Sequence, residues 1–351
     1  MSSIKHTING TFIGTRKLHL ELQKGNKYMQ SFLVLVTARS FGNADKKAWE
    51  LLSAHGCEVR HLKATEQESL EAQLDRHIAV ADGIIAGLEM YDRQLLSKAE
   101  RLKVISRYGV GYDAIDLAYA QERNIVVTIT PGANGDSVSD LAVALMLSAA
   151  RHVPYMHQQM QKGESQRPTG VEMWHKTLGV LGTGRIGAGV VKRCRGFEMD
   201  VLCHDMYENE ELKERYGVRY VDFDTLVRSS DFISIHTPLT QETSNLFNAE
   251  VFAKMKKRAV LVNTARGGII NEEDLAVALQ EGQIGAAALD VTLMGTPYQG
   301  PLASLANCIL TPHAGAATYE ASSNMSLMAS QNLVEVLEGH LCVNGVNRAM
   351  P

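Results

Sequence analysis

The chain of 351 residues is 45% apolar and 21% charged and carries a net charge of -4, which is typical of a globular protein with about two domains. It has no basic block, no basic-aromatic pattern and no apolar run near the ~20 residues that span a bilayer, so nucleic acids and membranes are disfavoured and small molecules are the expected partners. Its five cysteines lack CxxC spacing and are odd in number, which argues against a disulfide framework or structural zinc site and favours a reducing cytoplasm.

Residues 1–30 are basic, lack the apolar run of a signal peptide, and show no helical or strand periodicity. We therefore expect a poorly packed N-terminal extension. The first convincing strand begins at Phe32, shortly after Met29. One hypothesis is that translation starts at Met29, which the intact mass of the native protein would test.

Strand-like and helix-like segments alternate from Phe32 onward. The segments FLVLV, CEVRHL, ADGIIAG, LKVISRYG and NIVVTIT are typical of strands, and ADKKAWELLSAHG and EQESLEAQLDRHI of amphipathic helices. Alternation without hairpin signals predicts a parallel sheet with helices on both faces. A Pro-Gly break then precedes SVSDLAVALMLSAARHV, a helix so apolar that we expect it to be buried inside a domain or at a subunit contact.

A second series begins with KTLGVLGTGRIGAGVVKRC. A strand over Thr177–Leu181 is followed by Gly182, Gly184 and Gly187 in a GxGxxG pattern, and then by a helix. Such glycines allow a tight turn and close approach of a pyrophosphate to the helix N-terminus. The next strand ends at Asp205, an acid placed to bind the adenosine ribose, which favours NAD over NADP. The alternative is a structural turn with a surface aspartate, but strand, glycines, helix and acid in register favour the nucleotide.

Four later strands end in polar residues. These endings are His236-Thr237-Pro238, Thr264-Ala265-Arg266, Asp290 and His313. Ligands of doubly wound sheets bind beyond the carboxyl ends of the strands, so these groups are predicted to face one crevice. For His236 we favour a structural role in the turn before Pro238. For Arg266 and His313 we favour ligand binding, because small residues flank both.

The chain resembles the D-isomer-specific 2-hydroxyacid dehydrogenase family, especially its phosphoglycerate-dehydrogenase-like branch. From about Phe32 to the C-terminus, the resemblance is carried by LKVISRYGVGYDAIDL, ITPGANGDSVSDLAVALML, KTLGVLGTGRIG, HTPLTQET, VNTARGGIINEEDL, GAAALDV and TPHAGAAT. It implies an α/β fold of two Rossmann-like, doubly wound parallel-sheet domains with an interdomain cleft. Residues 31–130 plus 319–351 would bind substrate and residues 131–318 would bind NAD, in a homodimer formed through the helix near Asp140 to Ala150.

The family's activity is hydride transfer between nicotinamide and C2 of a small D-2-hydroxy acid or 2-keto acid. By resemblance, Arg266 clamps the substrate, His313 is the acid/base, and the backbone N–H groups of Val110 and Gly111 hold the carboxylate. Asp290 would accept a hydrogen bond from the nicotinamide carboxamide. The residues expected at the NAD site are Gly182, Gly184, Arg185, Ile186, Gly187, Asp205, Thr237, Pro238, Thr264, Ala265, Asp290, His313 and Gly315.

The loop after Asp290 departs from the family pattern DVFxxEP, whose glutamate pairs with the histidine and raises its pKa. That position falls here on Gly295 or Thr296. Thr292, Thr296 or Tyr298 would still be able to orient the imidazole, and Glu89 is a candidate to replace the acid. If nothing replaces it, we expect keto-acid reduction to weaken as pH rises through the histidine pKa.

Two functions remain open, a dehydrogenase with a modified acid/base pair and a catalytically weak, corepressor-like NAD(H) sensor. The presence of both Arg266 and His313 favours the enzyme. No metal is expected, because the histidines lack HxxxH-type spacing. The substrate is left open between a phosphorylated acid, for which Arg107 and Arg39 are the candidate ligands, and a small unphosphorylated acid such as glyoxylate, hydroxypyruvate or pyruvate.

Overall fold

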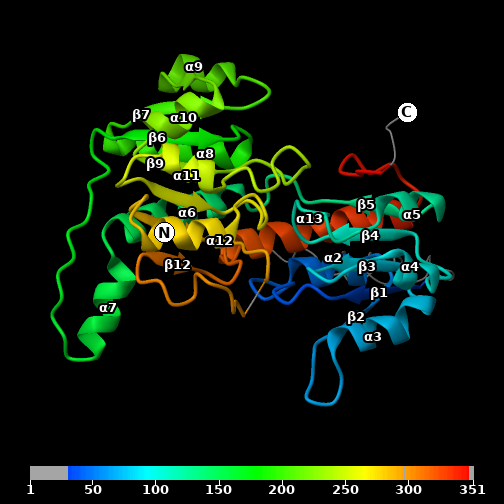
Figure 1. The fold of residues 1–351 in the computed structure, drawn as a ribbon. Helices are drawn as coiled ribbons and strands as arrows, with labels where there is room; N and C mark the ends of the chain where they lie inside the picture. Colours follow the sequence, from blue (N-terminus) through cyan, green and yellow to red (C-terminus); the bar gives the residue numbers. More distant parts are fainter. Residues whose placement is uncertain (1–30, 296, 348–351) are drawn as a thin grey trace, which may run out of the picture. The chain divides into compact units, whose positions relative to one another are not determined.

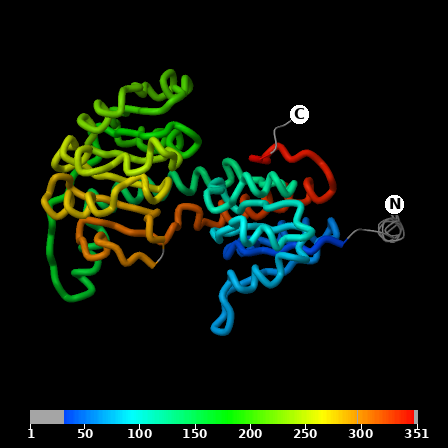
Figure 2. Tube along the Cα trace, turned by 45° about the vertical axis from the view of Figure 1, so that its right-hand side comes forward, coloured from blue at the N-terminus to red at the C-terminus, as the bar shows by residue number. Residues whose placement is uncertain are grey.

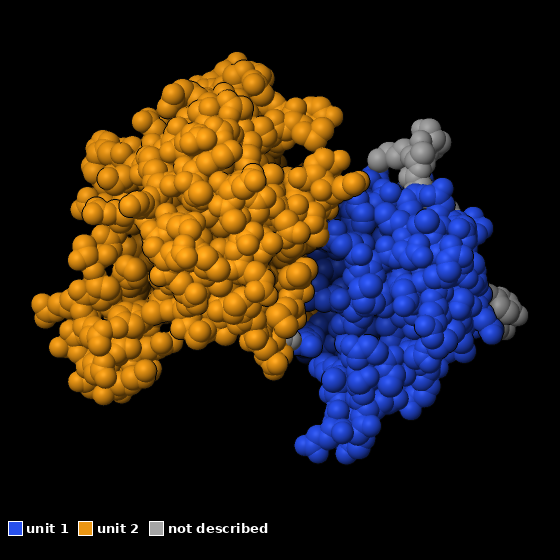
Figure 3. All heavy atoms as spheres, in the orientation of Figure 1, with its two compact units in different colours: residues 1–39, 46–129, 329–351 blue, residues 40–45, 130–328 orange. Residues whose placement is uncertain are grey.

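The computed structural model describes residues 31–295 and 297–347. The predicted N-terminal extension, Met29 and Thr296 lie outside these residues. The chain divides into two compact units (Figure 3). Within the described residues, unit 1 contains 31–39, 46–129 and 329–347, and unit 2 contains 40–45, 130–295 and 297–328. The division differs from the predicted boundaries at residues 40–45, 130 and 319–328, which belong to unit 2.

Unit 1 is built on a five-stranded parallel sheet in the order β2-β1-β3-β4-β5. Its strands are β1 (Phe32–Val36), β2 (Cys57–His61), β3 (Gly83–Ala86), β4 (Val104–Arg107) and β5 (Val126–Thr128). Its helices are α2 (Lys47–Ala54), α3 (Leu70–His77), η1 (Ile78–Val80), α4 (Arg93–Ser97) and α5 (Leu117–Glu122) (Figure 1). This order is one of the two common doubly wound topologies.

The C-terminal segment completes unit 1 and lies beside β5 (Figure 2). The side chain of Asn347 accepts a hydrogen bond from Val127 N (2.9 Å) and donates to Ile125 O (2.7 Å). Asn332, buried on α13 (Tyr319–Leu337), donates to Ile129 O (2.8 Å). Backbone groups at this edge of the sheet are therefore satisfied by asparagine amides.

Unit 2 is built on a seven-stranded parallel sheet in the order β12-β11-β10-β9-β6-β7-β8. Its strands are β6 (Thr177–Leu181), β7 (Asp200–His204), β8 (Arg219–Tyr220), β9 (Phe232–Ile235), β10 (Val260–Asn263), β11 (Ala286–Leu289) and β12 (Cys308–Leu310). The order reverses between β6 and β9, which is the switch point at which doubly wound folds bind ligands. Together with unit 1, this confirms the predicted fold class of two doubly wound parallel-sheet domains.

Helices cover both faces of the unit 2 sheet. They are α6 (Gly135–Ala150), α7 (Val153–Gln161), α8 (Arg185–Cys194), η2 (Arg195–Phe197), α9 (Glu210–Tyr216), α10 (Phe223–Ser229), α11 (Ala249–Lys254) and α12 (Glu272–Gln280). On β10, Leu261 joins the core beneath α10, α11 and α12, whereas Val260 and Val262 join the core beneath α6 and α8. Side chains of a strand alternate between faces, so β10 is apolar on both sides.

Helix α6 buries one face against the sheet and leaves part of the other exposed. Leu145 and Met146 are buried, whereas Leu147 is 37% exposed. Helix α7 and the segment after it extend away from the unit 2 sheet in both Figure 1 and Figure 2, and Met160 on α7 is 66% exposed. Among the described residues, no helix is long and apolar enough to cross a membrane.

Candidate active site

The glycine-rich loop connects β6 to α8, and a side chain is excluded at Gly182 and Gly187 for different structural reasons. Gly182 has φ +90, and a Cβ there would lie 2.7 Å from the carbonyl carbon of His236 on the neighbouring strand connection. A Cβ on Gly187 would lie 2.0 Å from Gly182 O, so helix and strand pack too closely for a side chain. At Gly184 a Cβ meets nothing within 4 Å, which leaves open space in front of the α8 N-terminus. This cradle fits a pyrophosphate.

Asp205 follows β7, and its carboxylate is tied to the glycine-rich loop. Oδ2 accepts from Thr183 N (2.5 Å) and Thr183 Oγ1 (3.0 Å), and Oδ1 accepts from Tyr207 N (3.2 Å). Burial acts to raise the pKa of Asp205, but these hydrogen bonds outweigh it and lower the pKa below its ordinary value. The side chain is therefore ionised at neutral pH and suited to a ribose hydroxyl rather than a 2′-phosphate.

Asn263 organises the loop that carries Arg266. At the end of β10, its Oδ1 accepts from Ala265 N (2.9 Å) and its Nδ2 donates to Arg266 O (2.8 Å). Asn263 is 1% exposed, while Arg266 is half-buried and its Nη1 donates to Ala265 O (2.7 Å). Thr264, buried, starts this loop. Sequence reasoning missed Asn263, although its position as the polar end of an apolar strand was a signal.

Asp290 anchors the loop that carries His313. Its carboxylate accepts from Thr311 Oγ1 (2.6 Å), Ala314 N (2.7 Å) and Gly315 N (2.8 Å). Its own carbonyl accepts from His313 N (3.0 Å), and His313 is exposed with φ +55. Left-handed backbone is costly for a residue other than glycine, so the hydrogen bonds around it must hold it. The buried carboxylate thus fixes the backbone from which the imidazole projects.

Sheet register brings these groups to one edge of unit 2. Asn263 pairs with Leu289, and Leu289 pairs with Leu310. Arg266, Asp290 and His313 therefore follow the carboxyl ends of three adjacent strands, β10, β11 and β12. Gly182 and Asp205 follow β6 and β7 at the same edge, and the half-buried Thr237 and exposed Pro238 follow β9.

His236 follows β9 and is neutral at ordinary pH. Its Nε2 lies 2.7 Å from Ser234 Oγ and its Nδ1 lies 3.5 Å from Thr264 Oγ1. Burial lowers the pKa of His236 to about 3. A group with this pKa cannot act as a proton donor near neutral pH, so His236 is not suited to acid/base work.

The loop after Asp290 is held by Glu272, a residue that sequence reasoning missed. Glu272 Oε1, at the start of α12, accepts from Leu293 N (2.6 Å). A Cβ on Gly267 would lie 2.4 Å from the carbonyl carbon of Thr292, so this loop also packs directly on the Arg266 loop. The Thr292 hydroxyl donates to Gly295 O (3.1 Å) within its own loop.

Tyr298, the other described candidate to orient the imidazole, lies near Glu272. Burial, followed by the nearby Glu272 carboxylate, raises the pKa of Tyr298 to about 12. No Asp or Glu occurs between Asp290 and Glu320 in the sequence.

The predicted substrate residues of the first domain lie after β4 in unit 1. Val110 is 41% exposed, and in the part of the chain that the structure describes no backbone carbonyl accepts from the N–H of Val110 or Gly111. Arg107 Nη1 donates to the carbonyl of Tyr108 at the start of this loop and lies 3.4 Å from Ala86 O. Glu89 is also in unit 1, with its Oε2 buried, so its suggested pairing with His313 stays a prediction.

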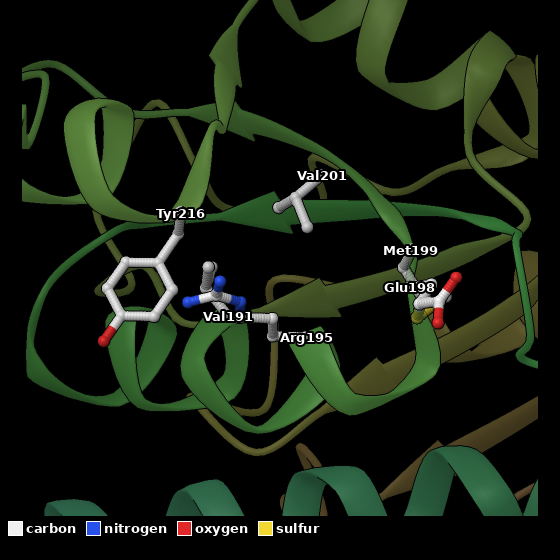
Figure 4. Close-up of a pocket in the computed structure, with 6 residues that line it drawn as sticks. All are labelled: Val191, Arg195, Glu198, Met199, Val201 and Tyr216. Carbon is white, nitrogen blue, oxygen red and sulfur yellow. The ribbon is translucent and has the colours of Figure 1, made fainter.

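Two hollows lie away from these strand ends. One, of about 310 Å³, is lined by Val191, Arg195, Glu198, Met199, Val201 and Tyr216, and lies toward the opposite end of β7 from Asp205 (Figure 4). The other, of about 440 Å³, lies in unit 1 and includes Glu89 and Lys98. We assign the site from the strand ends and the glycine-rich loop, because the chemistry-bearing groups gather there. Over the described residues there is also no group of three potential metal ligands.

All five cysteines are free thiols. Burial raises the pKa of each, to about 11 for Cys57 and Cys342 and about 12 for Cys194, Cys203 and Cys308. None is therefore an activated nucleophile.

Comparison with known proteins identifies the family. Residues 143–315 match the family model described as D-isomer specific 2-hydroxyacid dehydrogenase, NAD binding domain. The chain is 43% identical to a D-3-phosphoglycerate dehydrogenase of Methanocaldococcus jannaschii over 81% of this chain and 54% of that protein. It is 40% identical to a glyoxylate reductase of Thermococcus litoralis (73% and 80% covered) and 37% identical to a glyoxylate/hydroxypyruvate reductase B of Citrobacter koseri (82% and 92%).

Solved structures agree with these relatives. A Thermus thermophilus protein matches with a TM-score of 0.80 and 35% identity, over 90% of this chain and 99% of that one. D-lactate dehydrogenase from Aquifex aeolicus, complexed with NAD and lactic acid, matches with a TM-score of 0.78 and 26% identity, over 91% and 100%. The chain spans 54% and 57% of the lengths of two phosphoglycerate dehydrogenases that it matches. On this evidence the chain belongs to the D-isomer specific 2-hydroxyacid dehydrogenase family.

Proposed function

We propose that the protein is an NAD-dependent oxidoreductase that interconverts a small D-2-hydroxy acid and the corresponding 2-keto acid. The observation that carries the proposal is the row of Arg266, Asp290 and His313 beyond three adjacent strands of the sheet that also carries the glycine-rich loop. NADH would supply the hydride to C2 during keto-acid reduction, and NAD+ would accept it during hydroxy-acid oxidation. Gly182, Gly184 and Gly187 would receive its pyrophosphate, and Asp205 its adenosine ribose.

Arg266 and His313 divide the remaining work. The guanidinium of Arg266 binds the substrate carboxylate and keto oxygen, since its planar fork matches two oxygens at once. The His313 imidazole gives a proton to the keto oxygen during reduction and removes it during oxidation. Asn263 and Asp290 hold the two loops so that these groups keep their positions.

The proposal assigns a separate ligand to each unit. We assign substrate binding to unit 1, with the N–H groups of Val110 and Gly111 receiving the carboxylate, and NAD binding to unit 2. The alignment covers 80% of the glyoxylate reductase and 92% of the glyoxylate/hydroxypyruvate reductase, but only 54% of the phosphoglycerate dehydrogenase of Methanocaldococcus jannaschii. We therefore rank small unphosphorylated keto acids ahead of phosphorylated ones. No observation favours a corepressor-like sensor.

The loss of NADH absorbance on addition of single 2-keto acids tests this proposal. Glyoxylate, hydroxypyruvate, pyruvate and phosphohydroxypyruvate are the substrates to compare, and the reverse reaction is run with D- and L-lactate or glycerate. We expect turnover of at least one keto acid and oxidation of the D isomer alone. NADH binding without turnover of any keto acid would contradict the proposal.

A further inference from the structure

The hydroxyl groups of Thr183 and Tyr220 connect to the Asp205 carboxylate through a continuous chain of hydrogen bonds. Asn209 N lies 2.8 Å from the Tyr220 hydroxyl, the Tyr220 hydroxyl lies 2.9 Å from Thr183 Oγ1, and Thr183 Oγ1 lies 3.0 Å from Asp205 Oδ2. Thr183 lies in the glycine-rich loop and is 4% exposed. Tyr220 is on β8, where it pairs with Cys203 of β7, and Asn209 caps α9. Four separate elements thus meet at one carboxylate.

The direction of every hydrogen bond in this chain is fixed by its two ends. The Asn209 amide N–H can only donate, and the ionised Asp205 carboxylate can only accept. The Tyr220 hydroxyl therefore accepts from Asn209 and donates to Thr183, which in turn donates to Asp205. Each bond polarises the next, and turning Asp205 away would leave the buried Thr183 hydroxyl without its acceptor.

Backbone and side-chain donors fix the position of the Asp205 carboxylate. A carboxylate has about four acceptor positions. Thr183 fills positions on Oδ2 with its N–H and its hydroxyl, and the Tyr207 N–H fills one on Oδ1. The backbone N–H of Met206 also hydrogen-bonds to this carboxylate, so several donors hold it and a ribose hydroxyl would meet oxygens of fixed location.

We propose that Tyr220 and Thr183 are positioning residues that lock the Asp205 carboxylate in one orientation and thereby set the selection of NAD over NADP. The inference rests on the proposed function, since it concerns the cofactor of that site. A locked carboxylate accepts from the ribose and repels a 2′-phosphate at the same point. A carboxylate that is free to rotate loses part of its hydrogen bond with the ribose and repels the 2′-phosphate less strongly.

Dissociation constants for NADH and NADPH, measured by nicotinamide fluorescence without substrate, test the proposal. We expect Tyr220→Phe and Thr183→Val each to lower the preference for NADH over NADPH by roughly 3- to 10-fold, the loss of one buried hydrogen bond. The double variant should lose no more than Thr183→Val alone, because Tyr220 acts only through Thr183. Thr183→Ser, which keeps the hydroxyl, should retain the preference of the natural protein.

Tyr216→Phe is the matched control, since Tyr216 also lies in unit 2, on α9, but is outside the hydrogen-bond chain. A thermal melt checks that each variant is folded. An unchanged preference in folded Tyr220→Phe, or additive losses in the double variant, would overturn the proposal and leave the proposed function standing. Failure of the unaltered protein to bind either dinucleotide would overturn both.

Discussion

At the scale of single residues, His236 couples the stability of unit 2 to pH. In the folded protein its pKa of about 3 lies below the ordinary value of 6.5. The contribution of neutral His236 to the free energy of unfolding is therefore fully present above pH 6.5 and is lost as pH falls toward 3. Between pH 7 and pH 5 the natural protein should therefore lose about 2 kcal/mol more unfolding free energy than His236→Asn, which cannot titrate. Urea unfolding at both pH values measures this difference, and equal losses would show that His236 is protonated in the fold.

A second prediction at this scale separates the geometry of the Arg266 side chain from its positive charge. Arg266→Lys keeps the charge but loses the planar fork, so we expect kcat/KM for keto-acid reduction to fall by about 100-fold, with NADH affinity unchanged. Arg195→Lys, in the hollow of Figure 4, is the matched control and should retain full activity. If Arg266→Lys were as active as the natural protein, Arg266 would not be the substrate clamp.

At the scale of elements, Asp290 holds the residue 311–315 loop through three hydrogen bonds. Asn at this position brings an NH2 group that faces the N–H donors, so Asp290→Asn should lower the unfolding free energy by about 2 kcal/mol. It should also lower kcat by displacing His313. Thr311→Val removes a single donor and should have the smaller effect in both measurements. Equal stability of Asp290→Asn and the natural protein would contradict the anchoring role.

The same element shows how far sequence reasoning extends. Strand periodicity and the Asp at the end of β11 correctly placed Asp290 at the sheet edge, and the resemblance suggested a nicotinamide contact for it, which stays a prediction. Its three partners lie 21 to 25 residues further along the chain, where no local pattern reveals them. Helices α4 and α5 were also not predicted, because five and six residues are too few to establish a helical period.

Longer elements and motifs could be predicted from the sequence, because several residues in each indicate the same structure. The GxGxxG loop, the apolar strands and the long helix α6 each combine several consistent residues. In contrast, the Tyr220–Thr183–Asp205 chain depends on the pairing of β8 with β7, and Glu272 meets the loop after Asp290 only through the fold. These contacts join residues from different elements, so they cannot be predicted before the order of the strands in the sheet is known.

At the scale of the whole molecule, we propose a homodimer formed through α6, as the resemblance implies. Leu147 on α6 and Val153 on α7 are apolar side chains that are 37% and 49% exposed, and we propose that they pack against a second copy of the chain. Leu147→Glu should convert the dimer to a monomer in sedimentation or light scattering. Val277→Glu, on the exposed face of α12, should remain dimeric. A natural protein that is monomeric at micromolar concentration would refute this assembly.

That the loop after Asp290 lacks the glutamate expected from the resemblance stays a prediction. We propose that no glutamate of this loop pairs with His313, since the sequence holds no acid between Asp290 and Glu320. Whatever its surroundings, an imidazolium that protonates the keto oxygen must lose its proton as pH rises. Reduction should therefore decline on the alkaline side of the His313 pKa.

The most direct test is the rate of NADH oxidation with a saturating 2-keto acid from pH 5.5 to 9, for the natural protein and for His313→Asn. The account predicts turnover that falls as pH rises through one ionisation, and at least a 100-fold loss of turnover in His313→Asn. Turnover that is independent of pH and equally rapid in His313→Asn would show that His313 is not the acid/base of this protein.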